Sequence, residues 1–260
     1  PILPDGLTKL YCGDMHLQEL PELPQNLEVL RCNYNFLTDL PSLPESLVEL
    51  DISANHLTVC PEFPPNLWSL SCGSNEFPFI QELPDSLERL VMYQAELLAV
   101  LPEFPSTLEY VACTNGELTY LPDLPEGLKM LNCGGHNISQ LPGLPSSLEQ
   151  LYVSNSPLYR LPTLPDSLTH LSCYSDIMTC LPHLPDNLTS LTFNEDLIVC
   201  LPNIPIGIDP SLYSLPICDL NGPHYCDHGA EVTGKVFYDG NENCVIDTTE
   251  IGLHGRVVQS

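Results

Sequence analysis

LPQNLEVLRCNYNFLTDLPS, residues 23–42, decides the fold, because its pattern LPxxLxxLxCxxNxLxxLPx returns along most of the chain. Copies begin every twenty residues, except for one extra residue between Leu83 and Phe104. Self-similarity at a fixed period of this length indicates a solenoid in which each repeat forms one coil. The repeats start at Leu3, Leu23, Leu43, Phe63, Leu83, Phe104, Leu124, Leu144, Leu164 and Leu184, with a degenerate start at Ile204.

The apolar residues of the repeat indicate how a coil would pack. With Leu23 counted as position 0, apolar side chains stand at positions 0, 4, 7, 9, 14 and 17. Positions 7 and 9 alternate with outward-facing neighbours as in a short strand, so we expect the coils to form a parallel sheet with strands about 4.8 Å apart. The prolines of each LPxLP junction disfavour helix and favour an extended return path. Since one coil cannot bury its own apolar set, stacking must supply the core.

A side-chain amide recurs at position 12 of the early repeats, as Asn35, Asn55 and Asn75. A buried asparagine there can bond turn backbone groups that would otherwise lack partners. Other residue types interrupt this ladder in the later repeats, which we therefore expect to be less regular. The interruptions fall at Ala95, Gly116, His136, Ser156, Asp176 and Asp196.

These repeats resemble the short, twenty-residue leucine-rich repeats of bacterial type III effectors, which share LPxLPxxLxxLxVxxNxLxx. The resemblance covers roughly residues 1–205. It implies a β-rich leucine-rich repeat solenoid with a parallel sheet on its concave face and extended, polyproline-like segments on its convex side. It implies little about function, because one fold hosts many binding roles.

The period fails after about residue 205. We interpret residues 206–230 as a C-terminal cap and linker, because they carry Pro, Gly, Asn and Asp. Residues 231–260 contain DGNENCVIDTTE, whose oxygen-bearing groups have the spacing of a calcium loop, although Cys244 replaces the usual glycine. An acidic turn without an ion is the alternative. The predicted Ca²⁺ ligands are Asp239, Asn241, Asn243, Asp247 and Glu250, with the backbone carbonyl of Val245.

The segment GKVFYDGNENCVIDTTEIGLHGRVV also resembles the opening of the SdrD-B-like calcium-binding β-sandwich modules of bacterial surface adhesins, including type IX-secreted proteins of Bacteroidota. Residues 231–260 would then be the truncated N-terminal part of such a module. The resemblance implies export to the bacterial cell surface or release from the cell. Because the sequence begins within a repeat and without Met, we expect it to be a fragment or a processed form.

By the same resemblance, the short Asp-Ser/Thr motifs of exported Bacteroidota proteins are candidate O-glycosylation sites. Unmodified hydroxyls are the alternative, because a three-residue match is weakly specific. The candidate acceptors are Ser86, Ser167 and Thr248.

The chain has twelve cysteines of two kinds. Those at position 9, together with Cys60, are expected to be free, buried thiols that act as small hydrophobic residues. Four of the others are candidates for disulfides, which suit an extracellular setting, and the fifth, Cys244, lies in the predicted calcium loop. The first two share position 16 of adjacent coils, which places them within disulfide range. The next two follow the last coil and could form a second disulfide. Together with His224 and His228 they could instead form a zinc site. These pairs are Cys180 with Cys200, and Cys218 with Cys226.

The charge balance excludes some partners. Seven basic residues against 34 acidic ones give a net charge of −27. Such a surface is self-repelling and well solvated, with diffuse binding of divalent cations as the alternative. Nucleic acid is excluded as a partner, because little here could neutralise a run of phosphates. The sequence contains no apolar run long enough to span a membrane.

The sequence contains no recognisable catalytic constellation, so we expect a binding protein rather than an enzyme. The expected binding surface consists of positions 6, 8 and 10, which face outward from the strands. Tyr, Ser and Asn are frequent there, as in binding surfaces, although β-propensity alone also places Tyr and Thr on strands. The candidate ligand-binding residues are Tyr11, Arg31, Arg89, Tyr93, Tyr110, Tyr152, His170 and Tyr174.

The sequence therefore predicts an extracellular or cell-surface binding or adhesion protein that holds a protein, peptide or glycan on its sheet. One alternative is a secreted effector whose repeats recognise a host protein for an attached ubiquitin-ligase domain. A calcium-binding β-module in the tail would argue against such a domain. Another alternative is a structural spacer or an accessory subunit of an outer-membrane complex.

Overall fold

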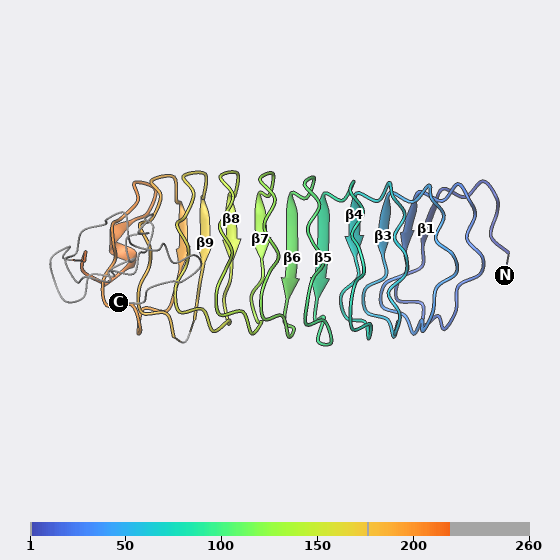
Figure 1. The fold of residues 1–260 in the computed structure, drawn as a ribbon, viewed down its shortest axis with the longest axis horizontal. Coiled ribbons are helices and arrows are strands. Elements are labelled where there is room, and N and C mark those ends of the chain that lie inside the picture. Colours follow the sequence, from blue (N-terminus) through green and yellow to red (C-terminus); the bar gives the residue numbers. More distant parts are fainter. Residues whose placement is uncertain (1, 176, 219–260) are drawn as a thin grey trace, which may run out of the picture. The chain divides into compact units, whose positions relative to one another are not determined.

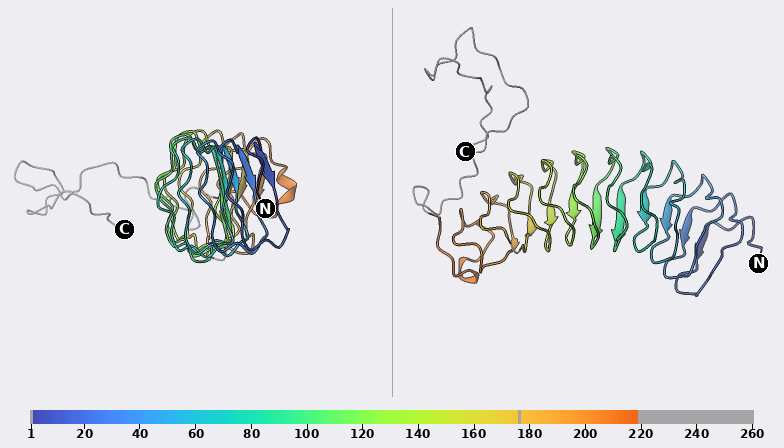
Figure 2. Two further views of the ribbon diagram at one scale, coloured as in Figure 1. Left: turned by 90° about the vertical axis from the view of Figure 1, so that its right-hand side faces the viewer. Right: turned by 60° about the horizontal axis from the view of Figure 1, so that its bottom comes forward.

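The computed structural model describes residues 2–175 and 177–218, and these residues form a solenoid of stacked coils (Figure 1). Each coil contributes one short strand, a turn and an extended return segment. Viewed along the long axis, the coils overlie one another (Figure 2). The strands are β1 Lys9–Tyr11, β2 Val29–Arg31, β3 Glu49–Asp51, β4 Ser69–Ser71, β5 Arg89–Tyr93, β6 Tyr110–Thr114, β7 Met130–Asn132, β8 Gln150–Tyr152, β9 His170–Ser172 and β10 Ser190–Thr192.

The ten strands form one parallel sheet in chain order. Equivalent repeat positions pair throughout, as in Leu10 with Leu30 and Leu30 with Leu50. The register continues from Arg89 to Tyr110, so the extra residue is accommodated in the turn after β5 and leaves the sheet intact. The predicted solenoid, with its sheet on one side and extended segments on the other, is confirmed.

The core runs along the solenoid, because the same repeat positions are buried in coil after coil. Leu27, Leu30 and Leu37, at positions 4, 7 and 14, are fully buried, and so are their equivalents Leu47 and Leu67. Each apolar side chain thus packs between its counterparts in the coils on either side, as stacking requires.

A proline-started turn closes the start of every repeat. The amide of Leu27 donates to the carbonyl of Pro24 at 3.0 Å, and the same bond recurs along the solenoid. It also forms in the degenerate repeat, where the amide of Ile208 donates to Pro205 at 3.1 Å. A short 3₁₀ helix, η1 Pro210–Leu212, follows. The solenoid therefore continues past residue 205, the expected boundary, and residues 206–218 extend it.

The predicted asparagine ladder connects neighbouring coils. The side-chain amide of Asn55 donates to the carbonyls of Cys32, at 3.0 Å, and Ile52, at 3.1 Å. Its oxygen accepts the amide of Leu37 at 3.0 Å. Asn35 and Asn75 make equivalent contacts one coil to either side. One side chain thus satisfies backbone groups of two coils, which confirms the role expected from the sequence.

Other polar side chains serve the ladder where asparagine is absent. The ring of His136 is 4% exposed, and its Nε2 lies 3.0 Å from the carbonyl oxygen of Cys113. The hydroxyl of Ser156 accepts the amide of His136 at 3.3 Å. Ser175, one position earlier in its repeat, donates to the carbonyls of Ser156 and Leu158. Histidine and serine thus bond the turn backbone at two of the positions where the asparagine ladder is interrupted.

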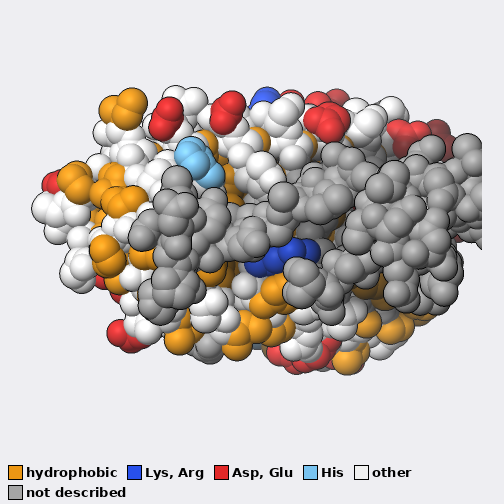
Figure 3. Space-filling model, turned by 60° about the vertical axis from the view of Figure 1, so that its left-hand side comes forward, with side chains coloured by type: hydrophobic (Ala, Val, Ile, Leu, Met, Phe, Trp, Pro, Cys, Tyr) orange, Lys and Arg blue, Asp and Glu red, His pale blue; other side chains and the backbone are white. Residues whose placement is uncertain are grey.

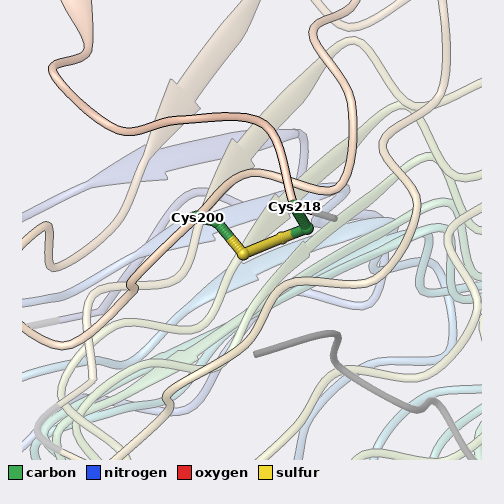
Figure 4. The surroundings of a disulfide bond; sticks show 2 residues. All are labelled: Cys200 and Cys218. Carbon is green, nitrogen blue, oxygen red and sulfur yellow. A yellow bond between two sulfur atoms is a disulfide. The ribbon is translucent and has the colours of Figure 1, made fainter. Parts of the chain in front are cut away.

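The cysteines divide as expected, but the predicted disulfide pairs are wrong. Cys200 is bonded to Cys218, with their Cα atoms 5.0 Å apart (Figure 4). The amide of Cys218 donates to the carbonyl of Leu201, and Leu201 forms a parallel bridge with Ile217. The segment after η1 thus lies beside the last coil and brings Cys218 next to Cys200, which prevents Cys200 from pairing with Cys180 or Cys218 with Cys226.

Seven other cysteines of the described residues are free thiols. Burial raises the pKa of Cys32, Cys113 and Cys173 to about 12, so these thiols are protonated and unreactive at neutral pH. The expectation that they act as core residues is confirmed. The free thiols are Cys12, Cys32, Cys60, Cys72, Cys113, Cys133 and Cys173.

Candidate functional site on the strand face

The outward-facing positions 6, 8 and 10 of β1–β10 form one continuous surface, here called the strand face. Side chains alternate between the two faces of a strand, so the side chain at position 7 points into the core and those at positions 6 and 8 point outward. Tyr11, Tyr93 and Tyr174 are exposed, and Tyr110, Tyr152 and His170 are half-buried. The structure thus places the predicted site residues on one face. Because successive coils are spaced along the strand face, the predicted site residues fall into three separate groups.

The first group lies on β1–β3. The guanidinium of Arg31 forms an ion pair with Glu49 at 2.5 Å, and its carbon lies 5.5 Å from the centre of the Tyr11 ring. Arg31 therefore has a carboxylate partner within the chain. Since half of its side chain is exposed, this ion pair contributes little to stability.

The second group lies on β5 and β6, the longest strands. Arg89 and Tyr110 are cross-strand neighbours, and the guanidinium carbon lies 3.8 Å from the centre of the Tyr110 ring. A cation this close to an aromatic face is attracted by the negative potential of the ring. Tyr93 stands at the end of β5 and is 45% exposed. Burial and the neighbouring Tyr110 raise the pKa of its hydroxyl, so Tyr93 is a neutral hydrogen-bonding group.

The third group lies on β8 and β9. The hydroxyl of Tyr152 donates to Oε1 of Gln150 at 3.3 Å, and the ring of His170 lies 2.9 Å from the hydroxyl of Thr169. The amide of Tyr174 donates to the hydroxyl of Ser154. These side chains are held by neutral neighbours and offer adaptable polar contacts.

Two of the strand-face residues that are buried despite their outward direction lie side by side on β5 and β6. Val91 is 9% exposed and Ala112 is 0% exposed, and the two pair across β5 and β6. They share their face with Arg89, Tyr93 and Tyr110, since residues two apart on a strand lie on one face. The second group therefore has a dry, apolar floor. The sequence shows small and apolar residues at these positions, but their burial depends on the larger neighbours.

Two further features of the surface were not expected from the sequence pattern. Phe36 stacks between His16 and His56 at the turn after the strands, with ring centres 5.6 Å and 6.0 Å apart. A row of exposed apolar side chains follows position 16 of four consecutive coils, away from the strand face. This edge row consists of Val59, Phe79, Val100 and Tyr120.

The acidic residues lie mainly at the rims of the coils. With the C-terminal side of the solenoid turned forward, Figure 3 shows acidic side chains along the upper edge and at places on the lower edge, and hydrophobic ones at the left end and along the lower edge. Within the described part of the chain, no helix is long and apolar enough to cross a membrane.

Two predicted glycosylation sites hold structural hydrogen bonds. The hydroxyl of Ser86 donates towards the carbonyls of Pro65, at 2.8 Å, and Leu67, at 2.9 Å. The hydroxyl of Ser167 donates to the carbonyl of Leu148 at 2.6 Å. Both serines are half-buried. Their modification stays a prediction, and the contacts favour the unmodified alternative, because an attached sugar removes the donor.

The remaining predicted sites lie outside the described residues. These are the calcium ligands Asp239, Asn241, Asn243, Val245, Asp247 and Glu250, the acceptor Thr248, Cys226 and the histidines of the zinc alternative. The β-sandwich module of residues 231–260 and the linker beyond residue 218 lie there too.

The fold and its ladder define a leucine-rich repeat solenoid with repeats of about twenty residues. The chain is similar to YopM from Yersinia enterocolitica, with 34% identity and a TM-score of 0.66, over 80% of this chain and 51% of YopM. It is also similar to the leucine-rich repeat domain of a Shigella effector, with 29% identity and a TM-score of 0.54, over 61% of this chain and 72% of that domain. The chain spans about half the length of YopM. No protein-family model and no curated protein sequence matches it.

Proposed function

We propose that the chain is a non-enzymatic binding protein that holds a protein or peptide ligand on its strand face. The observation that carries this proposal is the Arg89–Tyr110–Tyr93 group, where a cation, two aromatic side chains and a dry floor meet on the sheet. Aromatic side chains provide rigid contact area at low entropic cost, and arginine and tyrosine are frequent among residues that dominate binding energy.

We further propose that this binding takes place outside the bacterial cell or at its surface. The Cys200–Cys218 disulfide supports an oxidising environment, since such bonds persist mainly in exported proteins. The resemblance of residues 231–260 to calcium-binding surface modules supports the same setting, with Ca²⁺ held by the predicted loop.

The second candidate is a secreted effector that recognises a host protein. Its support is the similarity to YopM and to the Shigella effector domain. The two candidates share the strand face as the working surface. They differ in compartment and in what is attached, so surface labelling of the native protein on intact cells distinguishes them.

The binding role is tested by comparing two triple variants in a pull-down and adhesion assay with the full chain. The first replaces Tyr93, Tyr110 and Tyr152 with alanine on the strand face. The matched control replaces Val59, Phe79 and Tyr120 of the edge row, which are also exposed. The proposal expects the first variant to lose ligand capture and the control to keep it. Capture that survives the strand-face changes would contradict the proposal.

A further inference from the structure

Arg89 is half-buried and forms no ion pair with the described residues, whereas Lys9 and Arg160, the other described basic residues without an ion pair, are exposed. The chain has 34 acidic residues and seven basic ones. Among the described residues, the ion pairs join Arg31 with Glu49, Lys129 with Glu109 and His56 with Glu76. Within those residues, no carboxylate lies at ion-pair distance from Arg89. Its contact is instead the ring of Tyr110. A half-buried guanidinium on the binding face thus has charge that the chain itself does not neutralise.

The contact with Tyr110 orients this charge. At 3.8 Å the ring covers one face of the guanidinium. The N–H donors of arginine lie in the plane of the group, so stacking leaves them free for hydrogen bonds at its edge. Their fork matches the two oxygens of a carboxylate. Tyr110 therefore pre-organises Arg89 for such a ligand, which reduces the entropy lost on binding.

The residues around Arg89 would strengthen an ion pair between its guanidinium and a ligand carboxylate. The floor formed by Val91 and Ala112 is dry, and charges interact more strongly beside apolar groups than in bulk water. Tyr93, at the other end of β5, adds a neutral hydroxyl. A ligand group that reaches Arg89 would thus meet a charged donor, an aromatic wall and a hydroxyl.

We propose that Arg89, Tyr93 and Tyr110 form an anchor for the carboxylate of an Asp or Glu side chain in an extended segment of a protein partner. This inference rests on the proposed function, because it specifies the chemistry that the strand face recognises. Carboxylate is favoured over phosphate because the anchor has a single cation. Arg31 lies three strands away, about 14 Å at the usual strand spacing, and Lys129 is paired with Glu109. A phosphate dianion would also be repelled more strongly by the net charge of −27.

The test is an array of extended 12-residue peptides, incubated with the labelled full chain at physiological salt. Each acidic peptide is printed beside a partner in which Asn and Gln replace Asp and Glu, and beside a phosphoserine version. We expect the chain to retain acidic peptides over their amide partners. Arg89→Gln should weaken that binding by about tenfold to a hundredfold, the usual range for losing a charge-assisted hydrogen bond.

Two further variants show whether a loss of binding comes from the anchor itself, from a general loss of positive charge or from misfolding. Arg160→Gln removes an exposed cation that lies off the strand face, and binding should change by less than about twofold. Arg89→Lys keeps the charge but not the planar fork, so it should recover only part of the affinity. All variants are compared by circular dichroism, and Arg89→Gln should keep the wild-type spectrum.

The outcomes are distinct. Equal binding of acidic peptides and amide partners, or a preference for phosphoserine, overturns the carboxylate anchor while leaving a peptide-binding strand face. Equal losses from Arg89→Gln and Arg160→Gln overturn the anchor in favour of a diffuse charge effect. If the wild-type chain retains no peptide of any kind, the anchor and the proposed peptide-binding function both fail.

Discussion

The early and late coils share the same strand register but satisfy the backbone groups of their turns with different side chains. In the early coils one amide, as at Asn55, bonds carbonyls of two coils and accepts an amide as well. In the later coils His136, Ser156 and Ser175 divide this work, with fewer bonds from each. The sheet register is the same in both regions. The difference teaches that packing of the leucines determines how the coils stack. The ladder residues then provide hydrogen-bond partners for the backbone of the turns.

The largest effect should come from the core and should be the same in both regions. Leu50→Ala on β3 and Leu151→Ala on β8 each remove a fully buried side chain at position 7. Each should lower the free energy of unfolding by about 3–5 kcal/mol, as leucine truncation in a packed core does. Chemical denaturation of both variants measures the costs. A clearly smaller loss of unfolding free energy for Leu151→Ala than for Leu50→Ala would contradict the comparison, because it would show that the late coils are loosely packed.

The ladder should distinguish the regions. Asn55→Ala leaves the amide of Leu37 without its acceptor and should cost about 2–3 kcal/mol. It also removes one of two amide donors from the carbonyls of Cys32 and Ile52, which keep their bonds to Asn35 and Asn75. Ser156→Ala removes one bond from the amide of His136 and should cost about 1 kcal/mol. Thermal and denaturant unfolding give both values. Asn26→Ala, which removes only a 3.5 Å contact at an exposed turn, is the control and should be close to neutral.

The histidine in the ladder should make the later coils sensitive to acid. Burial lowers the pKa of His136 below its ordinary value of 6.5 in the folded chain. The unfolded chain therefore binds the proton more readily, and folding stability falls as the pH drops below about 6.5, levelling off below the folded pKa. His136→Asn restores the ladder amide without a titrating group.

The measurement is unfolding of wild type and His136→Asn between pH 8 and pH 5. The variant should lose less stability than wild type over this window. His183→Asn, which changes an exposed histidine, serves as the control and should follow wild type. Parallel curves for wild type and His136→Asn would contradict a ladder role for the neutral ring.

The smallest effect concerns the serine at the turn before the strand. Ser86→Ala removes a hydroxyl that bridges to the preceding coil and should cost about 1 kcal/mol, because the site is half-buried. Mass spectrometry of the native protein shows whether Ser86 and Ser167 carry sugars. An occupied, stable glycoprotein would mean that these hydrogen bonds are dispensable.

Much of the fold was predictable because its information is local and repeated. The spacing of leucine, proline and asparagine in one twenty-residue unit predicted the strand, the turn, the core and the ladder at Asn35, Asn55 and Asn75. The substitutes at His136 and Ser156 were missed because the pattern specifies asparagine, whereas the backbone needs only a partner of suitable reach.

Features that depend on long-range placement were harder to predict. The Cys200–Cys218 bond depends on the path after η1, where the repeat pattern has ended. The strand-face residues were predicted as a set, because alternation places them there. Their division into groups, the stacking of Arg89 on Tyr110 and the burial of Val91 and Ala112 arise from side chains on neighbouring strands.

The most direct test of a ligand-binding strand face is hydroxyl-radical footprinting of the tyrosines, with the chain free and then saturated with its tightest array peptide. Tyr93, at 45% exposure, lies on the strand face, whereas Tyr120 and Tyr159, at 50% and 48%, lie off it and serve as internal controls. We predict that the peptide slows oxidation of Tyr93 and Tyr110 and leaves Tyr120 and Tyr159 unchanged. Protection of Tyr120 and Tyr159 with Tyr93 unaffected would contradict the strand face as the ligand surface.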